Sequence, residues 1–152
     1  MAYVASEARQ QLLDDIGRAT DELGRSLAAL GAAYEQLDER NADRLEEELF
    51  RPVQQAYARA RRTHAGFAER HDLQGRTFDQ AAAGLPSQGV KGFLDNAVEA
   101  AGRADTAIAE LQDSMMPVEV GDAELRAGLA EVREALAAVR IRAREFVRTF
   151  GR

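Results

Sequence analysis

The sequence contains no cysteine, no tryptophan and only three prolines among its 152 residues. Without cysteine the chain forms no disulfide, offers no thiolate to a zinc ion and has no cysteine nucleophile. This absence argues against a small secreted disulfide scaffold, and we expect a cytoplasmic protein. Lysine is almost missing as well, since Lys91 is the single exception among arginines, a bias typical of a high-GC bacterial genome.

Long apolar segments are also absent from the sequence. No uncharged apolar run approaches the roughly 18 residues needed to cross a membrane. Residues 1–15 lack the basic region followed by an apolar region that marks an export signal. We therefore expect a protein without a membrane partner.

Positive charge is in deficit, because 26 acidic residues face 20 basic ones and the net charge is −6. A general attraction to nucleic acid is not expected at this charge. Arg140, Arg144 and Arg148 do form one row near the C-terminus, but nearby acidic helices compensate it and no exposed aromatic residue accompanies it. We interpret this row as a solvated helix face.

Apolar residues recur in alternating steps of three and four, which is the period of an amphipathic helix. The first stretch follows this pattern at Leu13, Ile16, Thr20, Leu23, Leu27, Leu30, Tyr34 and Leu37. The pattern predicts four helices, over residues 6–38, 43–72, 87–116 and 122–152. Asp43 with Glu46, Ser87 and Asp122 are the expected N-terminal caps. Pro52 predicts a kink, or a short helix ahead of it.

The predicted fold is all-α, with residues 1–152 in a single domain. Four helices joined mostly by short links pack most simply as an up-down-up-down antiparallel four-helix bundle. Such a bundle places the acidic first and third helices on a diagonal. The longest connection, residues 73–92, has Thr77 and Gln80 in capping-box spacing and predicts a short extra helix from Thr77 to Ala83.

Three glycines recur at a seven-residue interval in the first helix, at Gly17, Gly24 and Gly31. Each costs about 0.5–1 kcal/mol relative to alanine inside a helix. The sequence therefore predicts a compensating contact along this edge. Close packing of a neighbouring helix is the main interpretation, and an oligomer contact or space for a ligand are the alternatives.

Polar residues interrupt the apolar faces at one predicted level of the bundle. Antiparallel packing is expected to bring together Thr20, His64, Asn96 and Arg142. Such a polar layer usually fixes helix register, and it could alternatively form a small-molecule pocket. No metal site is predicted, because the apolar faces that carry His64 contain no Asp or Glu to complete a ligand set.

An anion site is the weaker alternative at the start of the third helix. Ser87, Gly89 and Lys91 could bind an anion there through free backbone N–H groups. The surrounding sequence fails as a phosphate-binding loop, because Val90 occupies the position that requires lysine and no strand precedes it. A surface connection is the competing interpretation.

The functional hypothesis is a non-enzymatic interaction or structural protein that acts through its helix faces and uses no cofactor. We expect a homodimer or a partner protein helix, with Ile141 in or near the interface because it lies opposite the apolar face of its helix. The alternative is a small-molecule-binding or sensor protein with a polar layer near His64. An enzyme is the third hypothesis and has the least support.

Overall fold

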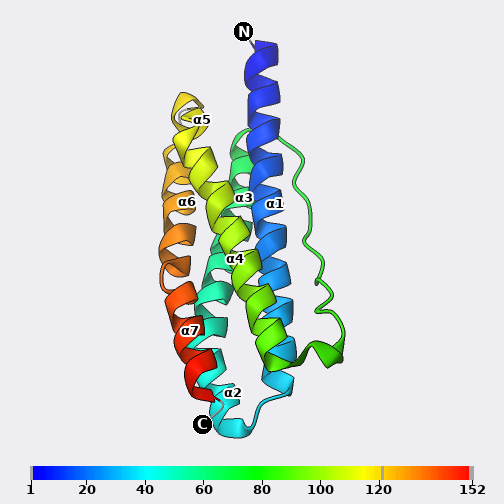
Figure 1. Cartoon of the computed structure of the whole chain (residues 1–152). Helices are drawn as coiled ribbons and strands as arrows, with labels where there is room; N and C mark the ends of the chain where they lie inside the picture. Colours follow the sequence, from blue (N-terminus) through cyan, green and yellow to red (C-terminus); the bar gives the residue numbers. More distant parts are fainter. Residues whose placement is uncertain (1, 121, 151–152) are drawn as a thin grey trace.

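The computed structural model describes residues 2–120 and 122–150, and the regular secondary structure in this part of the chain is helical, without a strand. The helices are α1 (Ala2–Glu35), α2 (Glu39–Leu45), α3 (Arg51–Arg70), α4 (Gly89–Asp113), α5 (Met116–Glu119), α6 (Ala123–Leu136) and α7 (Val139–Phe150) (Figure 1). The predicted all-α class is therefore confirmed. None of the described helices has an apolar stretch long enough to cross a membrane.

The second predicted helix begins earlier than its supposed cap at Asp43. α2 starts at Glu39 and continues through a π-helical turn, Glu46–Phe50, into α3. Within that turn the Arg51 N–H donates to the Glu46 carbonyl five residues earlier. This wider turn lies directly ahead of Pro52, which has no N–H to give, and such turns are where helices absorb an irregularity.

The last predicted helix is two helices in the structure. Asp122 caps α6 as expected, because its Oδ1 accepts a hydrogen bond of 2.8 Å from the Leu125 N–H. The helix is interrupted by a turn at residues 137–138 and resumes as α7. The final predicted positions, residues 151–152, lie outside the described residues.

Residues 73–88, here called the strap, contain no α-helix. The helix predicted from Thr77 to Ala83 is wrong, and the strap ends in one 3₁₀ turn, Pro86–Gln88. The strap stays extended because hydrogen bonds hold both of its ends in place. Arg76 donates to the Gly17 carbonyl at 3.1 Å, and Gln36 donates to the Pro86 carbonyl at 2.9 Å. A short run of helix-forming residues is too weak to compete with such tertiary anchors.

The predicted up-down-up-down order is also wrong, because α3 and α4 run in the same direction (Figure 1). Two contacts fix α4 antiparallel to α1: Ser26 donates to the Ala97 carbonyl, and Arg103 donates to Glu22. α3 is likewise antiparallel to α1, because a short link joins α1 to α2 and α2 continues into α3.

The length of the strap explains this order. Sixteen extended residues reach about 50 Å, while a 30-residue helix is about 45 Å long. The strap can therefore return along the whole molecule before α4 begins. As a result α1 and α4, the two acidic helices expected on a diagonal, are direct neighbours.

Small residues mark two places in the core where helices approach each other closely. Ala97 and Ala104 of α4 are buried where α4 packs against α1. α3 and α6 approach each other closely at Gly128, where an added Cβ would lie 2.9 Å from Cγ2 of the buried Thr63. α1 with α4 and α3 with α6 are thus the two helix pairs that pack together most extensively.

The glycine stripe does not mediate close helix packing as predicted. A Cβ at Gly17 would meet the Arg76 guanidinium at 3.2 Å, and one at Gly24 would meet the Tyr57 ring at 3.5 Å. At Gly31 nothing lies within 4 Å. Gly24 and Gly31 instead line a cavity of about 590 Å³ that α1 forms with α3 and the strap. The three glycines therefore face a strap side chain, an aromatic ring of α3 and open space, and not a closely packed helix backbone.

Candidate functional site

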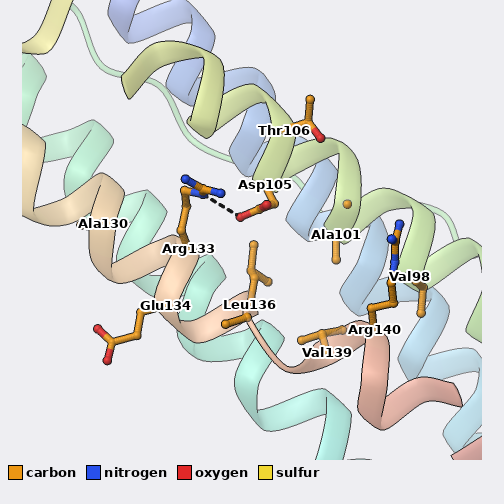
Figure 2. Close-up of a pocket in the computed structure, with 12 residues that line it drawn as sticks. Val98, Ala101, Asp105, Thr106, Ala130, Arg133, Glu134, Leu136, Val139 and Arg140 are labelled. Atoms are coloured by element: carbon orange, nitrogen blue, oxygen red, sulfur yellow. Dashed lines mark hydrogen bonds and ion pairs between the residues drawn. The ribbon is translucent and has the colours of Figure 1, made fainter. Parts of the chain in front are cut away.

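A groove separates α4 from α6 and α7. It consists of two adjoining cavities, of about 690 and 610 Å³, that share Val98 and Arg140 in their walls. Figure 2 shows the larger cavity, with α4 on one side and the junction of α6 and α7 on the other. The groove exists because α4 packs mainly on α1 and α6 mainly on α3, so the two pairs meet less closely on this side.

The floor of this α4–α7 groove is apolar. Most of its side chains are nearly inaccessible, and Val98 and Val147 are half-buried. The buried floor residues are Leu94, Ala101, Leu136, Val139 and Ala143. The floor is therefore apolar but largely covered, and Val98 and Val147 are its partly accessible side chains.

The two walls carry opposite charges at the α7 end. Asp95 and Glu99 project from α4, whereas Arg140, Arg144 and Arg148 line the α7 side. All five side chains are exposed. Asp95 pairs with Lys91 on its own helix, at 3.2 Å, and no ion pair is found for the other four in residues 2–120 and 122–150. Glu99 and the arginine row are thus available to an external partner.

Hydrogen bonds from Arg133 join α6 to α4 and fix the register of the groove. Arg133 Nε donates to Asp105 at 3.0 Å, and this hydrogen bond raises the pKa of Arg133 (Figure 2). Glu99 is six residues before Asp105, and Arg140 is seven residues after Arg133. Since α4 and α7 are antiparallel, Glu99 and Arg140 lie at about the same level on opposite walls. Glu134 of α6 is also among the residues that line the larger cavity (Figure 2).

The four residues of the predicted polar layer do not form one layer. Thr20 and His64 are buried, whereas Asn96 is half-buried and Arg142 is exposed. In the described part of the chain no hydrogen bond joins any two of them, and Thr20 donates to the Ile16 carbonyl at 2.8 Å. Asn96 lies near the start of α4, away from the level of Thr20, because the strap places that start at the other end of the molecule.

His64 faces α1 and the strap. Burial is the main reason that its pKa is lowered, and the charge of Arg76 lowers it further. Asp14 and Asp21 on α1 act in the opposite direction. The neutral imidazole is therefore favoured at neutral pH.

The predicted anion site is not assembled by its three residues. Ser87 lies in the 3₁₀ turn and does not cap α4, because the N-cap position belongs to Gln88. The Gly89 N–H is bonded to the Pro86 carbonyl, and Lys91 pairs with Asp95. The residues thus support the interpretation as a surface connection.

A polar cluster that the sequence analysis did not predict joins the end of α3 to the start of α6. Arg70 donates to both oxygens of Asp122, at 2.9 and 3.0 Å, and His71 Nε2 lies 2.8 Å from Asp122 Oδ2. Arg70 also contacts Glu124 at 2.7 Å. The cap function of Asp122 could be read from the sequence, but its two partners become neighbours only when the helices pack.

The charge of Asp122 is stabilised by these contacts. Burial alone would raise the pKa of this carboxyl, but hydrogen bonds from the Leu125 N–H, His71 and Arg70 together with the charge of Arg70 outweigh burial and lower the pKa. Both carboxylate oxygens are occupied. The cluster therefore holds α3 and α6 together and has no free carboxylate for acid–base chemistry.

The described residues contain no group of three or more His, Asp or Glu side chains placed to hold a metal ion. Comparisons of the chain with protein-family models, with curated proteins and with solved structures found no match. The α4–α7 groove is the largest cavity system described above, and the functional proposal is built on it.

Proposed function

We propose that this protein is a non-enzymatic interaction protein, a four-helix bundle that binds a second copy of itself through the α4–α7 groove. The observation that carries the proposal is the groove's charge pattern. Its apolar floor lies between an acidic wall on α4 and a basic wall on α7. A surface with both signs in this order is complementary to itself.

The symmetry of such a dimer follows from the walls. A two-fold axis parallel to the groove places α4 of one copy opposite α7 of the other, so Glu99 meets Arg140 of the second copy twice. An axis across the groove would instead oppose α4 to α4 and like charge to like charge. Charge complementarity therefore favours the parallel axis, since like charges at an interface are costly.

The dimensions of the groove support a docked helix pair. α4 lines it from Leu94 to Thr106, a length of about 18 Å at 1.5 Å per residue. Ile141 is 62% exposed and lies one turn from Arg144, beside the basic wall. A second copy would cover this aliphatic side chain along with the floor.

Sedimentation equilibrium across a range of protein concentrations tests the proposal. We expect a dimer for the wild type and weaker association for both Glu99→Arg and Arg140→Glu, because each change opposes like charges at the interface. Glu47→Arg and Arg51→Glu are matched controls, because both residues are exposed and belong to neither wall of the groove. A wild type that stays monomeric, or controls that weaken association equally, would overturn the proposal.

A further inference from the structure

A third cavity, separate from the α4–α7 groove, lies where the strap crosses α3. Its volume is about 390 Å³. α3 contributes three basic side chains, Arg61, Arg62 and His64, and the strap contributes Arg76 and Phe78. The cavity thus brings basic side chains of α3 and of the strap together beside one aromatic ring.

His64 is the unusual member of this set. Its side chain lines the cavity although the residue is only 3% exposed. The ring makes an edge-on contact with Phe78, with centroids 5.0 Å apart. No hydrogen bond to His64 is found in residues 2–120 and 122–150, and its ring nitrogens are not among the fully buried polar atoms that lack a partner there, so they keep some access to solvent. The imidazole can therefore bond to a group that enters the cavity, either water or a ligand.

The arginines around His64 differ in whether they are already paired with other side chains. Arg76 is held by Asp21 at 2.6 Å and lies over the Phe78 ring at 4.0 Å. Arg61 lies over the Tyr57 ring, and neither Arg61 nor Arg62 has an ion-pair partner in the described part of the chain. Two guanidinium groups are therefore available at the mouth of the cavity.

The acidic groups that face His64 come from α1 and lie outside the lining of the cavity. Asp21 is neutralised by Arg76, and Asp14 accepts a hydrogen bond from Gln10 at 2.9 Å. Neither aspartate is among the residues that line the cavity. The lining itself is basic and contains no carboxylate.

We propose that this cavity binds a small organic phosphate monoester, with Arg61, Arg62 and His64 around the phosphate and the organic group against Phe78. Arginine matches phosphate geometry through paired N–H donors, and several cationic groups favour a dianion over a carboxylate. A phosphate ion alone would leave most of 390 Å³ unfilled, whereas an organic group would use the Phe78 ring and the neighbouring Ala58 and Ala65. Protonated His64 donates to the bound phosphate, so binding is accompanied by proton uptake.

Titration calorimetry and histidine NMR with phenyl phosphate, inorganic phosphate and benzoate test this proposal on the full chain. We expect saturable binding of phenyl phosphate, tighter than that of the other two probes, and a shift of the His64 ring resonances toward the protonated form. Arg62→Gln and His64→Gln should each weaken binding by about tenfold or more. Arg51→Gln, which removes an exposed arginine elsewhere on α3, should leave binding unchanged.

Each of the remaining outcomes contradicts one part of the proposal. Inorganic phosphate that binds as tightly as phenyl phosphate excludes the organic group, and benzoate that binds as tightly excludes the dianion. Equal loss in Arg51→Gln and Arg62→Gln reduces the effect to overall charge and overturns the site. Because His64→Gln also perturbs a buried position, Arg62→Gln, at an exposed position, keeps the test independent of folding. The outcome of these binding measurements does not depend on whether the protein dimerises through the α4–α7 groove.

Discussion

Gly128→Ala is a direct test of the packing between α3 and α6. An alanine Cβ at this position would overlap Thr63 Oγ1 and lie 2.9 Å from its Cγ2 and 3.1 Å from its Cβ. Thr63 cannot rotate away at no cost, because its hydroxyl donates to the Arg59 carbonyl at 2.8 Å and the residue is buried. One of the two helices must therefore shift.

Two opposing effects decide the size of the change. Replacing glycine by alanine inside a helix stabilises by about 0.5–1 kcal/mol. Overpacking a tight contact destabilises by about 1–3 kcal/mol. The overlap involves a Cβ and a branched side chain rather than a flexible end, so the second effect should prevail. We expect the free energy of unfolding to fall by about 1–2 kcal/mol and Tm to fall by about 2–8 °C.

Urea unfolding followed by circular dichroism measures this change. The matched control is Gly102→Ala on α4, where an added Cβ meets nothing within 4 Å, and it should gain stability. In the double variant Gly128→Ala/Thr63→Ala the loss should be smaller than the sum of the two single losses, because the second change removes the overlapping atoms. Gly128→Ala at least as stable as Gly102→Ala, or strictly additive losses, would refute this reasoning.

Three further predictions concern the strap, the polar cluster and the groove. Gly31→Ala should raise the free energy of unfolding by about 0.5–1 kcal/mol in the same assay, because nothing lies within 4 Å of the added Cβ. Asp122→Asn should lower it by about 1–3 kcal/mol at neutral pH, through loss of its charged hydrogen bonds. The folded-state pKa of Asp122 is lowered, so the wild type should lose this stability as pH falls below about 4, and pH-dependent unfolding should find that loss missing in the variant. Ile141→Glu should weaken dimerisation in sedimentation equilibrium while changing monomer stability by less than about 0.5 kcal/mol.

The helices were largely predictable because helical periodicity is a local property. The apolar repeat around Leu13, Leu23 and Leu30 depends only on residues within two turns, and the Asp122 cap depends on a contact three residues away. The direction of α4 was not predictable in the same way. It depends on whether residues 73–88 fold into a helix or stay extended, and anchors such as Arg76 to Gly17 appear only after folding.

The site residues divide in the same way, into features that depend on nearby residues and features that depend on how the helices pack. Burial of His64 follows from its place on an apolar face, but its separation from Asn96 follows from the strap. The groove involves residues off the apolar faces, such as Glu99 and Arg140, whose distance apart depends on how two other helix pairs pack. Gly128 could have been noticed, because it is a glycine beside Leu129 on the buried side of its helix.

The most direct test of the proposed self-association mixes two variants that should each fail to dimerise alone. At the level where residues 99 and 140 meet, Glu99→Arg opposes two arginines and Arg140→Glu opposes two glutamates, so like charges meet there in either homodimer. In the mixed pair a basic wall faces an acidic one at both contacts. Sedimentation equilibrium should therefore find monomers in each separate solution and a dimer in the equimolar mixture. A mixture that remains as monomeric as its components would contradict self-association through the α4–α7 groove.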